Sequence, residues 1–165
     1  MTLGIPLLYV GEGINESGVV GFNIYSLIDG CKLYELNGSD KYASRGWPAF
    51  DSSAIVNAAT DSVVVGGENG LLYNIKLNTT YDKNNNTISI DPKINRYNFS
   101  SSFSRGRIGI ENSVATYANL AYFADNGGVI QCVDLNNLKP VWSIKGFDDI
   151  DATLTIDIEN DKPYV

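Results

Sequence analysis

The residue types that most often carry enzyme chemistry are scarce in this chain of 165 residues. It contains no histidine, which excludes a Ser-His-Asp triad, a histidine general base and a histidine metal ligand within the chain. Its two cysteines, Cys31 and Cys132, are too few for a disulfide framework and lack the spacing of a metal site. We therefore predict no catalytic residue, and carboxylates are the remaining groups to consider.

Two polar segments carry oxygen atoms that could bind a cation. Asp82, Asn84 and Asn86 stand at alternate positions, as at the start of a calcium loop, although Thr87 and Lys93 replace the glycine and glutamate of that loop. The second segment holds carboxylates that could bind a cation or raise one another's pKa: Asp148, Asp149 and Asp151. The alternatives are a solvated hairpin tip and a solvated connection. We expect no metal site.

The charge of the chain limits its partners. Lys and Arg number 12 against 19 Asp and Glu, so the formal net charge is −7. Phosphate backbones attract basic surfaces, and the chain has no uninterrupted basic stretch, so we expect no nucleic-acid partner. No run approaches the roughly 18 apolar residues of a membrane helix, and we expect no membrane span.

Short apolar runs bounded by Gly, Asn and Asp recur along the chain and must position these groups. From Asn119 to Trp142 the pattern is a strand, the turn Asp125-Asn126-Gly127-Gly128, a second strand, a polar turn and a third strand. Hairpin turns favour Asn and Gly because their central residues take positive φ. Apolar residues nowhere recur at helical spacing over a full window. The sequence predicts a nearly all-β protein.

The strands follow an internal repeat. Residues 53–77 and 113–135 share a layout of apolar strand, short turn, apolar strand, Gly-rich turn and third strand. Four strands per unit are the signature of propeller blades, which are four-stranded antiparallel meanders. We predict one partial β-propeller over residues 1–165, an incomplete ring of about three to four blades. The predicted blade segments are approximately 5–37, 52–100 with an insertion at 78–93, 112–145, and an incomplete 151–165 whose first strand is 152–156.

The repeat resembles that of a known family. The segment from Asp134 to Trp142 resembles the strand-turn-strand repeat of pyrroloquinoline-quinone-type propellers, written D-A-x-T-G-x-x-x-W, with Leu138 in place of the glycine. The turns at 67–70 and 124–128 are similar to those of quinoprotein-like propellers of bacteria. The resemblance implies about half of a propeller and favours an extracytoplasmic or cell-surface setting. It also implies that the repeat aromatics dock one blade on the next: Tyr34, Tyr97 and Trp142.

Quinoprotein dehydrogenases of this family add a catalytic Asp, a calcium site and, in many members, adjacent cysteines. This chain has no adjacent cysteines, and no carboxylate can be matched to the catalytic Asp. The resemblance therefore implies a fold and not redox activity. We expect no cofactor and no enzyme activity, and the alternative is an enzyme that binds pyrroloquinoline quinone and calcium.

Long connections between strands carry the candidate binding residues. Exposed aromatics beside arginine are enriched where proteins bind partners, and five such residues lie in these connections: Trp47, Phe50, Phe103, Arg105 and Arg107. The alternative is that Trp47 and Phe50 pack between blades. We predict a non-catalytic binding or scaffolding module of a bacterial protein, whose ligand could be a protein, a small molecule or a glycan. The alternatives are part of a quinone- and calcium-dependent dehydrogenase, and a purely structural surface-protein domain.

An incomplete ring has a further consequence. Its unpaired strand edges invite association with other chains. We therefore expect self-association through open blade edges.

Overall fold

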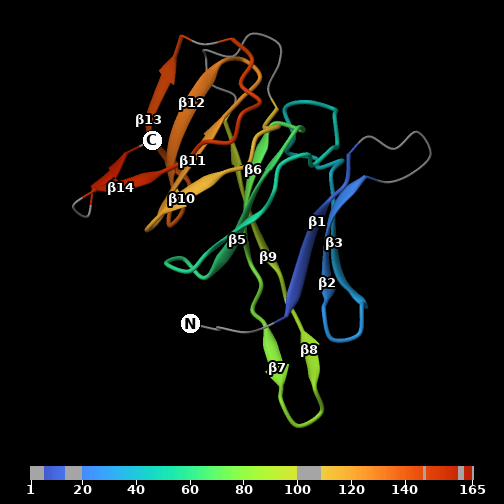
Figure 1. The fold of residues 1–165 in the computed structure, drawn as a ribbon. Helices are drawn as coiled ribbons and strands as arrows, with labels where there is room; N and C mark the ends of the chain where they lie inside the picture. Colours follow the sequence, from blue (N-terminus) through green and yellow to red (C-terminus); the bar gives the residue numbers. More distant parts are fainter. Residues whose placement is uncertain (1–5, 14–19, 100–108, 147, 160–161, 165) are drawn as a thin grey trace.

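The computed structural model describes residues 6–13, 20–99, 109–146, 148–159 and 162–164. All regular elements in these residues are β-strands, and they pair in antiparallel fashion (Figure 1). The all-β, propeller-blade prediction is confirmed. The described residues include no helix long and apolar enough to cross a membrane.

Three sheets follow one another along the chain. Blade 1 contains β1 (Leu7–Gly11), β2 (Gly21–Ser26) and β3 (Lys32–Asn37), in that order. Blade 2 contains β4 (Ile55–Asn57), β5 (Ser62–Gly67), β6 (Leu71–Lys76) and β9 (Lys93–Asn98). Blade 3 contains β10 (Ala115–Tyr117), β11 (Leu120–Ala124), β12 (Val129–Asp134) and β13 (Lys139–Lys145). Blade 1 shows no counterpart of β4 and β10 among the described residues.

Two short hairpins complete the described structure. Between β6 and β9 the chain forms β7 (Thr80–Asp82) and β8 (Thr87–Ser89), which project away from the blades (Figure 1). After blade 3, β14 (Asp157–Glu159) pairs with β15 (Lys162–Tyr164). The strand predicted over residues 152–156 is wrong, because these residues have no ladder partner. Leu154 and Ile156 instead pack as side chains against blade 3.

The hydrophobic core lies between blades. One cluster joins blade 1 to blade 2 through Phe22, Ile24 and Tyr73, and a second joins blade 2 to blade 3 through Leu72 and Phe123. Blade 2 is covered on both sides, so every residue of β5 is buried, in keeping with its continuous apolar run Val63-Val64-Val65. Aromatic rings contribute large buried areas to both clusters, with Phe22 and Tyr73 in the first and Phe123 in the second.

Side-chain amides add polar contacts between blades 2 and 3. Asn57 Nδ2 donates to the Ala118 carbonyl at 2.9 Å, and Asn74 Nδ2 donates to the Leu135 carbonyl at 3.0 Å. Both asparagines are buried. Since a buried polar group without a partner is costly, these bonds favour one relative placement of the two blades.

Residues with positive φ close the turns. Gly70 and Gly128 have φ of 85° and 76° in the turns that follow β5 and β11, where Asn-Gly pairs predict hairpins. Asp125 Oδ1 accepts the backbone N–H groups of Gly127 and Val129 and so stabilises the second of these turns. Leu138, which replaces a glycine of the repeat, takes φ of 54° nonetheless. This conformation is uncommon for a side chain of that size.

Candidate binding surface on the 38–49 loop

The connection from blade 1 to blade 2 runs through residues 38–49, here called the 38–49 loop. Its first turn is stabilised locally: Asn37 Oδ1 accepts the Ser39 N–H at 2.8 Å, and Asp40 Oδ1 accepts the Tyr42 N–H at 3.0 Å. Asn and Asp favour such turns because their side chains reach the backbone two residues on. The local sequence therefore bends the chain where blade 1 ends.

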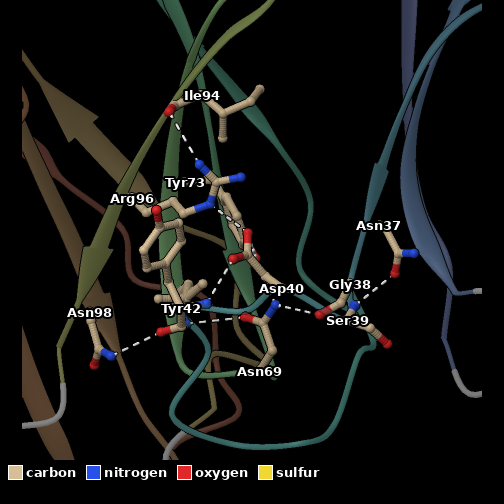
Figure 2. A network of polar contacts seen from close by, with 11 residues as sticks. Asn37, Gly38, Ser39, Asp40, Tyr42, Asn69, Tyr73, Ile94, Arg96 and Asn98 are labelled. Atoms are coloured by element: carbon tan, nitrogen blue, oxygen red, sulfur yellow. Dashed lines mark hydrogen bonds and ion pairs between the residues drawn. The ribbon is translucent and has the colours of Figure 1, made fainter.

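Asp40 also attaches the loop to blade 2 (Figure 2). Its Oδ2 accepts a hydrogen bond from Arg96 Nε on β9 at 2.5 Å, and the hydroxyl of Tyr73 on β6 lies 3.5 Å from the same oxygen. The Asp40 side chain is only 5% exposed. Burial, and to a smaller extent the Asp40 carboxylate, raises the pKa of Tyr73 well above its usual value, so the phenol keeps its proton and can donate. A buried carboxylate needs such a paired cation, and removing either partner is strongly destabilising.

Asn69, in the turn after β5, also attaches the loop to blade 2 (Figure 2). Its Nδ2 donates to the Gly38 carbonyl at 2.8 Å and to the Tyr73 hydroxyl at 2.6 Å. The Asn69 carbonyl accepts the Arg45 N–H at 3.1 Å. The two ends of the loop meet closely, since a Cβ on Gly38 would lie 1.8 Å from the Pro48 carbonyl oxygen. The loop is therefore held at several points of its length.

Two aromatic rings on this loop face solvent. Tyr42 is 55% exposed and Trp47 is 38% exposed. Each ring has a cation over it: the Arg96 guanidinium lies 5.5 Å from the Tyr42 centroid, and the Arg45 guanidinium lies 5.7 Å from the Trp47 ring. Such cation–π contacts attract the cation to the ring face by about 0.5–1 kcal/mol at exposed sites. Tyr42 also lines a cleft of about 440 Å³ with residues of blades 2 and 3: Leu71, Ile94, Asn95, Arg96, Asn98 and Leu138.

Carboxylates lie next to Arg45. Glu68 is 4% exposed, and its Oε2 is 3.6 Å from Arg45 Nη1. Burial first, then a hydrogen bond with Asp51 and the nearby charge of Glu111, raise the pKa of Glu68 to about 8. A carboxyl with this pKa is protonated at neutral pH, so the surface beside Arg45 is less acidic than its residues suggest.

A repeat position contributes two of these carboxylates. Asp51 and Glu111 each precede the residue that hydrogen-bonds the end of the following hairpin: Ser52 Oγ donates to the Gly66 carbonyl, and Asn112 Nδ2 donates to the Ala124 carbonyl. Asp151 takes the same place in the segment Ile150-Asp151-Ala152-Thr153. The alignment of Phe50-Asp51-Ser52-Ser53 with Ile110-Glu111-Asn112-Ser113 is the sequence signal that could have revealed this position.

The two predicted binding residues that the structure describes lie in different surroundings. Trp47 is exposed, but Phe50 is only 2% exposed and packs against Phe22 and Tyr73 at centroid distances of 5.9 and 5.5 Å. Phe50 is therefore a core residue between blades 1 and 2, which is the alternative placement considered from the sequence. Three of the predicted residues lie outside the described part of the chain: Phe103, Arg105 and Arg107.

The aromatics expected to dock blades occupy different registers. Tyr34 pairs with Ile24, and Trp142 pairs with Cys132, so the ladders place these two residues at equivalent positions. Tyr97 pairs with Leu72, two residues further along. Tyr34 packs on the core between blades 1 and 2, and the Tyr97 hydroxyl donates to Gln131 Oε1 of blade 3 at 3.1 Å. Trp142 packs against Tyr122 of its own blade with the two rings tilted, and it remains 36% exposed.

The oxygen atoms considered as cation ligands make other contacts. Asp82 accepts the Asn84 N–H at 2.9 Å and the Asn85 side chain at 2.7 Å, which lowers the pKa of Asp82. Asn86 accepts the Tyr81 hydroxyl. Asp148 accepts the Asp149 N–H, and Asp151 is exposed. In the described part of the chain, no three acidic or cysteine side chains gather in a way that could hold a metal ion.

Four-stranded meanders stacked face to face define the class of the protein: the chain is a segment of a β-propeller. Solved structures similar to it include the WD40 repeats of RRP9, with 10% sequence identity and a TM-score of 0.48 over 79% of this chain and 35% of that one. The WD40 β-propeller domain of Doa1 has 10% identity and a TM-score of 0.47, covering 82% and 39%. A chain of the mitotic checkpoint complex has 12% identity and a TM-score of 0.47, covering 88% and 35%.

The chain thus spans 35% to 39% of the length of these structures. No protein-family model matches the sequence, and no curated protein matches it. The assignment to the quinoprotein-like family stays a prediction.

Proposed function

We propose that the chain is a non-catalytic binding module of a β-propeller protein and that the 38–49 loop is its contact surface for a protein partner. The observation that carries the proposal is a pair of exposed aromatic rings on an anchored loop. Tyr42 and Trp47 face solvent, while Asp40, Arg96, Tyr73 and Asn69 attach the loop that bears them to blade 2.

Anchoring matters because binding costs conformational entropy. A ring that is already held in place loses little freedom when a partner covers it. Tyr, Trp and Arg are also the residues most enriched among those that dominate binding energy. The cleft beside Tyr42 adds a hollow with apolar walls, from Leu71, Ile94 and Leu138, and with polar groups at Asn95 and Asn98.

The resemblance of the repeat to quinoprotein-like propellers supports a bacterial, extracytoplasmic setting for this module. That setting and the family assignment belong to the proposal. They depend on the turn and strand motifs of the sequence, whereas the binding surface depends on the geometry of the loop.

The test is selection of peptide ligands from a random display library on the purified chain. We expect the selected peptides to bind Trp47→Ala and Tyr42→Ala at least about tenfold more weakly than the wild type, as for residues that dominate an interface. Leu27→Ala is the control, since Leu27 is 58% exposed and lies in the turn after β2, outside the 38–49 loop. Peptides that bind both loop variants as well as the wild type would contradict the proposal.

A further inference from the structure

The outward side of blade 1 carries side chains that the other blades bury. Leu7, Tyr9, Phe22 and Ile24 pack toward blade 2, and side chains alternate along a strand, so Leu8, Val10 and Asn23 point away from it. We call these three residues the blade 1 outer face. Leu8 is 44% exposed and Val10 is 37% exposed.

The ladder register identifies the equivalent residues in blades 2 and 3. Val10 pairs with Asn23, Val65 pairs with Tyr73, and Phe123 pairs with Gln131. Val65 and Phe123 are 0% exposed because each packs in a core shared with the preceding blade. Two residues earlier, Val63 and Ala121 are also buried where Leu8 is exposed. The blade 1 outer face therefore has the pattern of a surface that a preceding blade covers.

Asn23 gives a second, polar observation. It is 1% exposed, and neither its Nδ2 nor its Oδ1 has a hydrogen-bond partner. Its two equivalents obtain partners from the preceding side: Gln131 accepts from Tyr97 of blade 2, and Tyr73 bonds to Asp40 of the loop that leaves blade 1. A buried amide without partners is unfavourable. The position of Asn23 thus calls for a donor and an acceptor from a preceding blade.

The far side of blade 3 presents the opposite half of such a contact. Tyr122 and Cys132 point away from blade 2, and the Trp142 ring packs against Tyr122 at a centroid distance of 5.9 Å. Leu154 and Ile156 cover part of this side, but Trp142 and Ile144 stay 36% and 52% exposed. We call Trp142 and Ile144 the blade 3 outer face. By register, Ile144 faces Ile130 as Tyr97 faces Leu72, and Tyr97 is buried partly against the next blade.

We propose that the blade 3 outer face of one copy docks on the blade 1 outer face of a second copy, head to tail. The two faces repeat the two halves of the contact between blades 2 and 3, which is why a copy of this chain is the occupant. The expectation of association between strand edges becomes a contact between blade faces, and it is independent of the 38–49 loop.

Head-to-tail contacts can be tested by complementation between two variants. A buried charge opposes docking, so Leu8→Glu disables the blade 1 outer face and Ile144→Glu disables the blade 3 outer face. Sedimentation velocity of the full chain over a concentration series gives the dissociation constant. Salt is added to screen the repulsion between copies, because each copy has a formal net charge of −7. Leu27→Glu is the matched control, since Leu27 is 58% exposed in a turn outside both faces.

We expect the wild type and Leu27→Glu to associate equally and each face variant alone to have a dissociation constant at least about tenfold higher. Mixing Leu8→Glu with Ile144→Glu should restore a one-to-one complex, because one intact face of each kind remains. Circular dichroism and melting temperature establish that the variants are folded. A wild type that stays monomeric at its solubility limit would overturn the proposal, as would an oligomer that neither variant weakens or a mixture that does not recombine.

Discussion

Glu68 shows how the surroundings of a single side chain reset its chemistry. It lies under the 38–49 loop with Arg45 on one side and the carboxyls of Asp51 and Glu111 on the other. The arginine favours the charged form, but burial and the two carboxyls outweigh it, and the pKa is about 8 instead of the ordinary 4.5. The proton on Glu68 is thus part of the folded structure at neutral pH.

This proton predicts a pH dependence of stability. The folded chain keeps it up to about pH 8, whereas the unfolded chain releases it near pH 4.5. Between these values the folded state binds more protons, so the contribution of Glu68 to the free energy of unfolding falls as the pH rises. Glu68→Gln, which cannot ionise, should therefore gain stability relative to the wild type as the pH rises from 5 to 9.

Urea denaturation of both proteins at pH 5, 7 and 9 measures this effect. The difference between variant and wild type should grow with pH and level off above about pH 8. Glu159→Gln, at an exposed glutamate, is the control and should show no such growth. A constant difference between the Glu68 variant and the wild type would mean that Glu68 ionises normally.

Residue patterns predicted some side chains better than others. The aromatics at 34, 97 and 142 lie in β3, β9 and β13, but spacing alone could not show that Tyr97 lies two residues out of register with Trp142. The Asp40–Arg96 pair was missed, because the two residues are 56 positions apart and meet only when blade 2 has formed. Phe50 lies in a connection between strands, and it is buried because it packs between Phe22 of blade 1 and Tyr73 of blade 2.

At the scale of elements, the close crossing at the two ends of the 38–49 loop makes a specific prediction. Gly38→Ala would place a methyl group 1.8 Å from the Pro48 carbonyl oxygen, so the loop must shift. We expect a loss of roughly 1–3 kcal/mol in the free energy of unfolding, as in other overpacked sites. Weaker binding of loop-directed peptides should accompany it.

Gly46→Ala is the matched control within the same loop. A Cβ at Gly46 meets nothing within 4 Å, and its backbone does not need positive φ. This variant should match the wild type or gain up to about 1 kcal/mol, because alanine restricts the unfolded chain. Urea unfolding of the pair gives the comparison, and equal stability of the two variants would count against a tight crossing at Gly38.

Strands and hairpin turns were largely predictable, for reasons visible in particular segments. Asn69-Gly70 and Asn126-Gly127-Gly128 supply the positive φ that hairpins need, and the Val63–Val65 run marks a strand covered on both sides. Residues 152–156 alternate apolar and polar side chains as a strand does, but they have no ladder partner, so strand propensity alone did not make a strand there. Pairing is a tertiary property, which a local pattern does not contain.

For the whole molecule, burial predicts a gradient of local stability. Blade 2 is covered by both neighbours, whereas all seven residues of β13 are exposed and β14 pairs, among the described residues, with β15 alone. We expect the amides of β5 and β6 to exchange with deuterium most slowly and those of β13 and β14 faster, since exposed strands open more easily. Hydrogen-exchange mass spectrometry measures this order, and equal protection of β6 and β13 in a monomeric sample would contradict it.

The attachment of the 38–49 loop has a mechanical consequence. The loop is the covalent link between blades 1 and 2. Its contacts with Asn69, Tyr73 and Arg96 hold it folded against blade 2. A force that pulls the two blades apart must therefore break the Asp40–Arg96 pair before it extends the loop. The loop can extend only after that pair separates. Fully extended, residues 38–49 span about 40 Å.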